Sequence, residues 1–451
     1  MGKRFVGITV MPEFIQTESV NGLLDNIERR TGATAVATSP YVMEPADEGA
    51  GGREPPIDAG AGSVRLLDRP LWGKRELFVR TAPSFTPDLR RYAGLRYQPS
   101  APNALTEAQG PQLAAFVTEA KRRGLKVYFQ VQAAIPPGYR VQFGGPQDDD
   151  APRLPDGRVP LRRVDKNGSL GSPHILDYGA ALLQDLVTAY PQVDGFRIDW
   201  PEYPPYTLDD WFLDFSPHAK ARAAMLDIDA EHLQQQALDL HQRLQRGETA
   251  LLPGLFENPA MRDLQKLKAS LVDGLLARYR AALDGVNAYD KELMPNAFPP
   301  PWSRLSGFDY WRAAIHATSV SVKLYTMHWP MMLRFAAEAI KGSEDKAAQA
   351  LARLLDIVDG APPARLDAWH YPEPEEPHPV GLMAQRRKIA VARAEAGAMP
   401  VNALAHSYGP VDDFRRRLKV AWDASDGRVW INRYGYLSDA KLDVIGQVTS
   451  G

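Results

Sequence analysis

The chain lacks cysteine, long apolar runs and any marked excess of charge, and each absence removes a class of protein. Without cysteine, neither a disulfide framework nor a thiolate metal site can form. No apolar stretch approaches the ~18 residues that a membrane-spanning helix needs. The formal charge of -2 at pH 7 gives no reason to expect a nucleic acid or an anionic membrane as a partner.

Several motifs of cofactor-dependent and nucleophilic enzymes are also missing. The first apolar segment is not followed by G-x-G-x-x-G, which argues against a dinucleotide-binding fold. There is no His-Glu-x-x-His pair, no phosphate-binding Gly-Lys-Ser loop, no EF-hand and no nucleophile elbow for Ser-His-Asp hydrolysis. The spacing of Asp199, His328 and His406 does not favour a metal site. We therefore expect no metal and no cofactor.

What is present is a regular alternation of strand and helix patterns. Hydrophobic residues make up 44% of 451 residues, enough for a substantial core. The strands expected from short apolar runs are residues 5–11, 34–38, 126–132, 193–199, 292–297, 319–325, 400–405 and 428–432. The expected helices lie near 19–30, 106–123, 174–189, 261–284, 309–316, 331–341, 380–396, 410–422 and 438–448. This order predicts an α/β fold, a (β/α)8 TIM barrel forming one catalytic domain over residues 1–451.

Long insertions interrupt this alternation at 42–105, 133–173, 200–260 and 342–379. The first three follow strands, on the side of a barrel where active sites are built. The glycines of Ala59-Gly60-Ala61-Gly62 favour a mobile flap in the first insertion. Asp156-Gly157 favours a hairpin turn in the second, and the third contains a helix expected near 218–246.

The stretch 193–204, at the expected fourth strand, carries most of the chemistry. Asp199 ends the strand, Arg197 lies on the same side two residues earlier, and Glu202 follows on the loop. Two carboxylates beside Trp200 and Tyr203 suit acid/base and nucleophilic chemistry on a sugar. We expect Asp199 to be the nucleophile or stabiliser, Glu202 the general acid/base, and Arg197 the partner that orients Asp199. The alternative is a structural Arg197–Asp199 ion pair with Glu202 capping a loop.

The same residues resemble the motifs of two families of glycoside hydrolases. Gly195-Phe196-Arg197-Ile198-Asp199 resembles the strand-four nucleophile motif of the α-amylase superfamily. The set Asp194, Gly195, Asp199, Trp200, Glu202, Tyr203 and Pro204 resembles that of chitinase-type hydrolases, with Pro201 inserted and Arg197 where an aspartate is usual. The resemblance implies a carbohydrate-active barrel with Asp199 as nucleophile or stabiliser. The amylase glutamate after strand five and aspartate after strand seven have no counterpart here.

The expected sixth strand adds a possible polar wall. Lys323 and Tyr325 share one side of it, and His328 and Trp329 are expected on the loop that follows. In a sugar site, Lys323 and His328 would bind hydroxyls or tune the carboxylates while Trp329 stacks on a ring. Alternatively, Lys323 neutralises a buried carboxylate and Tyr325 belongs to the core. A lysine on strand six also allows a class I aldolase-like lyase with Lys323 as Schiff base.

Other strand ends supply further candidates for substrate binding, and Asp309 is a second candidate for the proton donor. These residues are Tyr41, Gln132, Asn296, Asp309, His406 and Arg433. Together they predict a mouth that suits a polyhydroxylated ligand, in a glycosidase or in a non-catalytic carbohydrate-binding barrel. Because Phe5–Val10 is too short for a signal sequence, we expect a cytoplasmic protein. The sequence specifies neither the sugar nor an oligomeric state.

Overall fold

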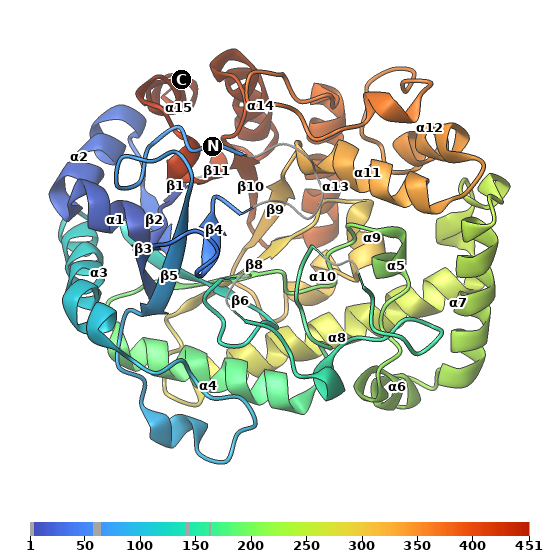
Figure 1. Ribbon diagram of the computed structural model, residues 1–451, viewed down its shortest axis with the longest axis horizontal. Coiled ribbons are helices and arrows are strands. Elements are labelled where there is room, and N and C mark those ends of the chain that lie inside the picture. Colours follow the sequence, from blue (N-terminus) through green and yellow to red (C-terminus); the bar gives the residue numbers. More distant parts are fainter. Residues whose placement is uncertain (1–3, 57–64, 141–143, 162–163, 451) are drawn as a thin grey trace.

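A closed barrel of parallel strands forms the centre of the computed structural model, which describes residues 4–56, 65–140, 144–161 and 164–450 (Figure 1). Neighbouring strands pair in the order β1-β11-β10-β9-β8-β7-β6-β2, and β2 returns to β1. The eight strands are β1 (Phe5–Thr9), β2 (Ala35–Thr38), β6 (Lys126–Gln132), β7 (Gly195–Asp199), β8 (Glu292–Ala297), β9 (Val320–Leu324), β10 (Val401–His406) and β11 (Arg428–Asn432). The predicted (β/α)8 barrel is confirmed.

Strand β8 forms although Pro295 lies inside it. Its pairing with β9 involves only Asn296 and Ala297, opposite Ser321 and Val322. On the other side Pro295 is paired with Ile198 of β7, but there the Glu292 N–H donates to Asp194, so alternation along the strand turns the nitrogen of Pro295 toward β9. Because Pro295 lies outside the β9 ladder, its missing N–H removes no hydrogen bond from either ladder. This explains why a proline that weakens the strand pattern in the sequence is tolerated in the barrel.

Large side chains from the strands fill the barrel interior. They form a separate apolar cluster of Phe5, Ala35, Ala37, Tyr128, Met294, Leu404 and Trp430. The Trp430 indole leaves no room at Gly7, where an added Cβ would lie 2.2 Å from the ring. Glycine at this position of β1 therefore allows the indole to occupy the centre of the barrel.

Helices surround the barrel and complete the strand–helix alternation. They are α1 (Pro12–Glu18), α2 (Val20–Thr31), α3 (Ala104–Arg122), α4 (Pro173–Ala189), α5 (Leu208–Trp211), α6 (Pro217–Ala224), α7 (Ala230–Gln245), α8 (Pro259–Asp284), α9 (Trp302–Ser306), α10 (Tyr310–Ala313), α11 (His328–Ala339), α12 (Glu344–Leu354), α13 (Leu382–Ala396), α14 (Val411–Ala424) and α15 (Asp439–Thr449). The last helix, α15, packs between α14 and α2 and so closes the ring.

One predicted helix is wrong in its extent. The segment 218–246 forms two helices, α6 and α7, rather than one. Asp227, between them, has a positive φ of 55° that interrupts the helical backbone. The Asp229 side chain then accepts hydrogen bonds from the Glu231 and His232 N–H groups and starts α7 as its N-cap.

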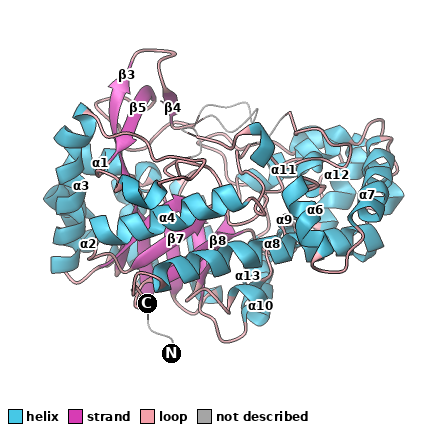
Figure 2. Ribbon diagram, turned by 90° about the horizontal axis from the view of Figure 1, so that it is seen from below, coloured by secondary structure: helices cyan, strands magenta, loops and turns pink. Residues whose placement is uncertain are grey.

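The first insertion contains a small sheet that the sequence pattern did not predict. Strands β3 (Tyr41–Ala46), β5 (Leu77–Pro83) and β4 (Gly52–Glu54) pair antiparallel in the order β3-β5-β4. Because β3 begins just after β2 ends, this sheet stands over the C-terminal end of the barrel, away from the chain termini in Figure 2. The glycines of the predicted flap, at 59–62, lie outside the described residues.

The second insertion has the predicted turn but not a hairpin. The Gly157 N–H donates to the Leu154 carbonyl at 2.9 Å and the Leu154 N–H donates to the Arg158 carbonyl at 2.8 Å. No strand flanks this turn in the residues that the structure describes there.

Within the described chain, no helix has both the length and the apolar character needed to cross a membrane.

Candidate active site at the barrel mouth

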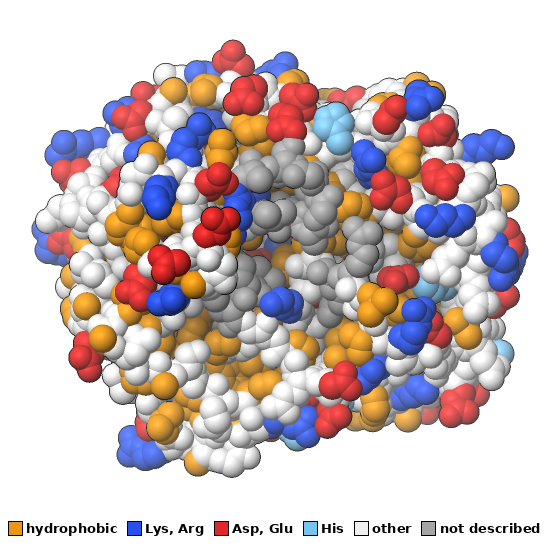
Figure 3. All heavy atoms as spheres, viewed as in Figure 1, with side chains coloured by type: hydrophobic (Ala, Val, Ile, Leu, Met, Phe, Trp, Pro, Cys, Tyr) orange, Lys and Arg blue, Asp and Glu red, His pale blue; other side chains and the backbone are white. Residues whose placement is uncertain are grey.

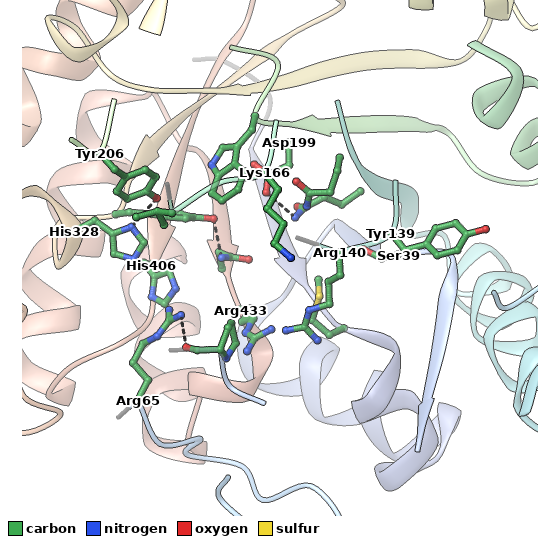
Figure 4. A pocket seen from close by; sticks show the side chains of 18 residues that line it. Ser39, Arg65, Tyr139, Arg140, Lys166, Asp199, Tyr206, His328, His406 and Arg433 are labelled. Carbon is green, nitrogen blue, oxygen red and sulfur yellow. Dashed lines mark hydrogen bonds between the residues drawn. The ribbon is translucent and has the colours of Figure 1, made fainter. Parts of the chain in front are cut away.

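A cavity of about 360 Å³ opens at the C-terminal end of the barrel (Figure 4). Its wall combines the ends of several strands with the inserted loops, and it consists of Met11, Ser39, Pro56, Arg65, Gln130, Gln132, Tyr139, Arg140, Val164, Lys166, Asp199, Trp200, Tyr206, Tyr325, His328, His406, Asn432 and Arg433. Seven of the residues predicted from the sequence meet here: Gln132, Asp199, Trp200, Tyr325, His328, His406 and Arg433. Barrel enzymes place their chemistry at this end.

Asp199 is the only carboxylate among the described residues that line the cavity. Its Oδ1 forms an ion pair of 2.9 Å with Lys323 Nζ, and Gln130 Nε2 donates to its Oδ2 at 3.4 Å. The Asp199 side chain remains 14% exposed, whereas that of Lys323 is 1% exposed. A buried ammonium on β9 thus compensates a carboxylate on β7 that still reaches the cavity.

Arg197 does not have the role that the sequence predicted. It is fully buried beneath the cavity and its Nη atoms donate to Thr9 Oγ1 at 2.8 Å and to Asn296 Oδ1 at 3.2 Å. Its guanidinium stacks 4.1 Å from the centre of the Trp430 ring. Burial lowers its pKa to about 10, against the opposing charges of Tyr325 and Asp199. The structure gives the position beside Asp199 to Lys323 instead.

Glu202 is completely buried and does not line the cavity. Phe298 N–H donates to its Oε1 at 2.7 Å and Ser306 Oγ to its Oε2 at 2.6 Å. Burial raises the pKa of Glu202 to about 7, and the charge of Asp199 adds to this, while Lys323 and the two hydrogen bonds oppose it. The two carboxyls therefore lie close enough to interact electrostatically, but only Asp199 opens to the cavity.

The backbone between these carboxylates is held in an unusual conformation. Trp200 has a φ of 49°, in the left-handed region that bulky residues rarely adopt. The Asn167 Nδ2 group donates to the carbonyl of Trp200 at 2.9 Å and to that of Glu202 at 2.7 Å. This clamp from the second insertion fixes the turn that sends the Trp200 side chain to the cavity wall and the Glu202 side chain into the interior.

One side of the cavity is aromatic and rich in histidine. Tyr206 Oη and His328 Nδ1 share a hydrogen bond of 3.0 Å, and Asn432 Nδ2 donates to Tyr325 Oη at 2.8 Å. The ring of His406 packs edge-on against Tyr325. Burial lowers the pKa of His406 well below its usual value, as do the nearby positive charges of Arg65 and other groups. His406 is therefore neutral at physiological pH.

The other side of the cavity contains the predicted Arg433 together with Arg65 and Arg140, which were not predicted from the sequence. Arg140 and Arg433 share Glu54, which forms a buried ion pair with each of them. Arg140 also pairs with Glu13 at 3.2 Å, and Tyr41 Oη donates to Glu13 at 3.0 Å. Burial alone would raise the pKa of Glu54, but the two guanidinium charges lower it below its ordinary value.

These cationic side chains come largely from the insertions. Arg65 belongs to the first, and Arg140 and Lys166 belong to the second. Arg140 had a signal, because it lies eight residues past the end of β6 in a proline- and glycine-containing turn. Arg65 and Lys166 had none, since long loops carry many charged residues and their spacing does not show which face the mouth.

Several predicted site residues lie away from the cavity. Tyr203 Oη is buried and donates to Asp214 at 2.8 Å. Asp309 caps α10, where its Oδ1 accepts from Arg312 N–H at 3.1 Å. Trp329 packs in the core beside Lys388. Tyr41 accepts a hydrogen bond from Arg140, and Asn296 accepts one from Arg197. His328 and Trp329 begin helix α11 instead of forming the predicted loop.

The described residues contain no group of three or more His, Asp or Glu side chains arranged to hold a metal ion. On the face seen in Figure 3, acidic and basic side chains are interspersed rather than gathered by sign. The concentration of positive charge therefore belongs to the cavity wall and not to this outer surface as a whole.

Neither a protein-family model nor a curated protein matches the sequence. Among solved structures, the catalytic domain of a beta-amylase from Paenibacillus polymyxa superposes with a TM-score of 0.51 at 10% identity, over 97% of this chain and 94% of that one. A class V chitinase from Pseudomonas fluorescens Pf-5 is similar at a TM-score of 0.44 and 11% identity, with both chains fully covered. At such identities, the likeness to the beta-amylase shows a shared barrel fold and nothing finer.

Proposed function

We propose that this protein is a glycoside hydrolase, or a closely related carbohydrate-active enzyme, with Asp199 as its catalytic carboxylate. One observation carries the proposal: Asp199 ends the fourth barrel strand, opens to the cavity and is paired at 2.9 Å with the buried Lys323. An ionised carboxylate at this point can attack an anomeric carbon or stabilise the positive charge that develops on it. The beta-amylase-like barrel fold supports the proposal only as an analogy.

The wall around Asp199 suits a sugar ring. Three lining residues offer aromatic surface, Trp200, Tyr206 and Tyr325, and three offer hydrogen-bonding amides, Gln130, Gln132 and Asn432. Sugars present both apolar faces and hydroxyl edges, so that aromatic and amide groups on one wall bind them together. The cavity volume of about 360 Å³ is at the small end for ligand sites, which favours a ligand of one or two rings.

For the proton donor we propose Glu202, because its pKa of about 7 suits a general acid near neutral pH. In the conformation described, Glu202 has no contact with the cavity, so this role requires the loop after β7 to move when substrate binds. The wall itself offers a second donor, the Tyr206–His328 pair. The two donors predict different responses to substitution of Glu202.

The first test is turnover of aryl glycosides and oligosaccharides by wild type, Asp199→Asn and Asp309→Asn. Loss of the catalytic carboxylate should lower kcat by ~10²-fold or more, whereas Asp309→Asn, at the start of α10 and away from the cavity, should retain full activity. Unchanged turnover in Asp199→Asn would remove this residue from the mechanism. Product anomers read by NMR would give the stereochemical outcome.

The proton donor can be identified by comparing substrates whose leaving groups differ in how much protonation they need. If Glu202 is the acid, Glu202→Gln should slow substrates with poor leaving groups far more than nitrophenyl glycosides, which need little protonation. If Glu202 only positions the loop, both kinds of substrate should slow equally. His328→Gln provides the matched comparison for the Tyr206–His328 pair.

The lyase and binding-protein alternatives have less support. A Schiff-base lysine must present its amine to the substrate, whereas Lys323 Nζ is engaged in the 2.9 Å ion pair with Asp199, and Lys323 is not among the described residues that line the cavity. Borohydride trapping of a keto acid or aldehyde on Lys323 would revive the lyase. A binding protein would bind glycans without forming product, and Asp199→Asn would leave its affinity largely intact.

A further inference from the structure

Among the described residues that line the cavity, positively charged side chains outnumber carboxylates. We name the four residues Arg65, Arg140, Lys166 and Arg433 the cation-rich wall, and all four line the cavity. Asp199, the one carboxylate among the described lining residues, is already paired with Lys323. The Asp199 charge is therefore compensated from behind and does not offset this wall.

The buried carboxylates behind the wall balance only part of it. Glu54 lies between Arg140 and Arg433, and Glu13 contacts Arg140. Burial raises the pKa of Glu13 above its ordinary value, against the opposing charge of Arg140. Even with Glu13 counted as ionised, Glu13 and Glu54 match Arg140 and Arg433 one for one and leave the charge of Lys166 in excess.

Lys166 is exposed to the cavity, and no ion pair or hydrogen bond of its ammonium group is found among the described residues. In Figure 4 its side chain extends from the side of Asp199 toward the guanidinium groups of Arg140 and Arg433. An ammonium so placed, beside two buried arginines, provides a strong site for an anionic group. Arg65 adds a further guanidinium to the cavity lining, next to His406 in Figure 4.

We propose that the cavity takes a sugar that bears an anionic substituent, a carboxylate or a sulfate ester, with this substituent on the cation-rich wall and the anomeric centre at Asp199. The inference deepens the proposed function and rests on it for the position of the anomeric centre. The preference for an acidic sugar follows from the wall alone. An acidic substituent would also fix the orientation of the ring, since it is attracted to the cation-rich wall and repelled by the Asp199 carboxylate.

The test measures binding separately from turnover. Isothermal titration of wild type would compare glucuronate, galacturonate and mannuronate with glucose, galactose and mannose, and would add the 6-sulfates of the three neutral sugars. We expect at least one acid or sulfate to bind roughly tenfold or more tightly than its neutral partner, with a preference that weakens as salt is raised. The carboxylate and sulfate arms identify which anion the wall accepts.

Substitutions link the preference to the wall. Lys166→Gln should weaken binding of the preferred anionic sugar by about 2- to 5-fold and leave that of its neutral partner unchanged. Lys346→Gln, at an exposed lysine on α12, is the matched control and should change neither. Equal binding of each anionic sugar and its neutral partner, no binding of any anionic sugar, or an unchanged preference in Lys166→Gln would overturn the inference.

The two proposals fail in different ways. If aryl glycosides of neutral sugars are cleaved with the same kcat/KM as both the corresponding glycosiduronates and the corresponding 6-sulfated glycosides, the substrate inference is wrong and the hydrolase proposal stands. If anionic sugars bind with the expected preference but Asp199→Asn leaves all turnover unchanged, the role of Asp199 is wrong and the preference of the cavity for anionic sugars stands.

Discussion

Glu202 is the residue whose ionisation should leave the clearest mark on stability. The ordinary pKa of this carboxyl is 4.5, and in the folded protein burial raises it to about 7. Below pH 4.5 the carboxyl is protonated in both states and costs nothing. As the pH rises toward 7, the unfolded chain ionises Glu202 freely while the folded protein resists the charge, so Glu202 lowers the free energy of unfolding.

The size of this effect follows from the pKa. A rise from 4.5 to about 7 corresponds to about 3 kcal/mol, complete above pH 7. Glu202→Gln keeps a neutral side chain at every pH. Its stability relative to wild type should therefore improve by about 3 kcal/mol between pH 4.5 and pH 8. The Gln side chain cannot accept both hydrogen bonds from Phe298 N–H and Ser306 Oγ, and this loss shifts the difference equally at all pH values.

The assay is urea unfolding followed by tryptophan fluorescence at pH 5, 6, 7 and 8, with the variant compared to wild type at each pH. Glu119→Gln is the control. Hydrogen bonds from Arg122 and Arg123 lower the pKa of Glu119 to about 2, so its contribution to stability is lost only in acid. Its difference from wild type should stay level from pH 5 to pH 8. A level difference for Glu202→Gln would refute the reasoning.

Three further substitutions test an ion pair, a close contact inside the barrel and a helix cap. Lys323→Met leaves Asp199 without its cation and should lower the free energy of unfolding, measured in urea, by about 1–3 kcal/mol. The double variant with Asp199→Asn should recover most of this loss, and strictly additive losses from the two substitutions would contradict the ion pair. Gly7→Ala should cost about 3 kcal/mol because its Cβ would overlap the central indole, whereas Gly254→Ala, with open space, should stay within about 1 kcal/mol; equal losses would exclude overlap as the cause. Asp229→Ala should cost about 1 kcal/mol through loss of the α7 N-cap, and thermal melting that matches wild type would show the cap to be dispensable.

Local pattern was sufficient for the barrel and for one end of the site. The apolar runs at 126–132, 292–297 and 428–432 give strands with the same bounds in the structure, because a barrel strand is buried on both faces. The end of β7 was readable in the same way, so Asp199 was correctly expected at the mouth. The three-stranded sheet of the first insertion was not predicted, because segments that contain Gly and Pro show little of the residue pattern typical of strands.

Tertiary structure decided which groups face Asp199. In the sequence Arg197 is the cation nearest to Asp199. In the structure its guanidinium points into the barrel interior, where it donates to Thr9 and Asn296 and stacks on the Trp430 ring. Lys323, 124 residues away, reaches Asp199 instead because barrel closure brings β9 near β7. Such a pairing depends on strand stagger and barrel radius, neither of which is contained in the periodicity of one strand.

The sequence by itself thus determined the fold class and the presence of a carboxylate at the end of the fourth barrel strand. Only the folded chain decided that Glu202 is buried while Asp199 is open, and that Arg65, Arg140, Lys166 and Arg433 meet on one wall. The physical reason is that strands and helices arise from short-range repetition of apolar residues. The direction of a loop side chain, in contrast, is set by contacts such as the Asn167 clamp and the Glu54 ion pairs, which join residues far apart in the chain.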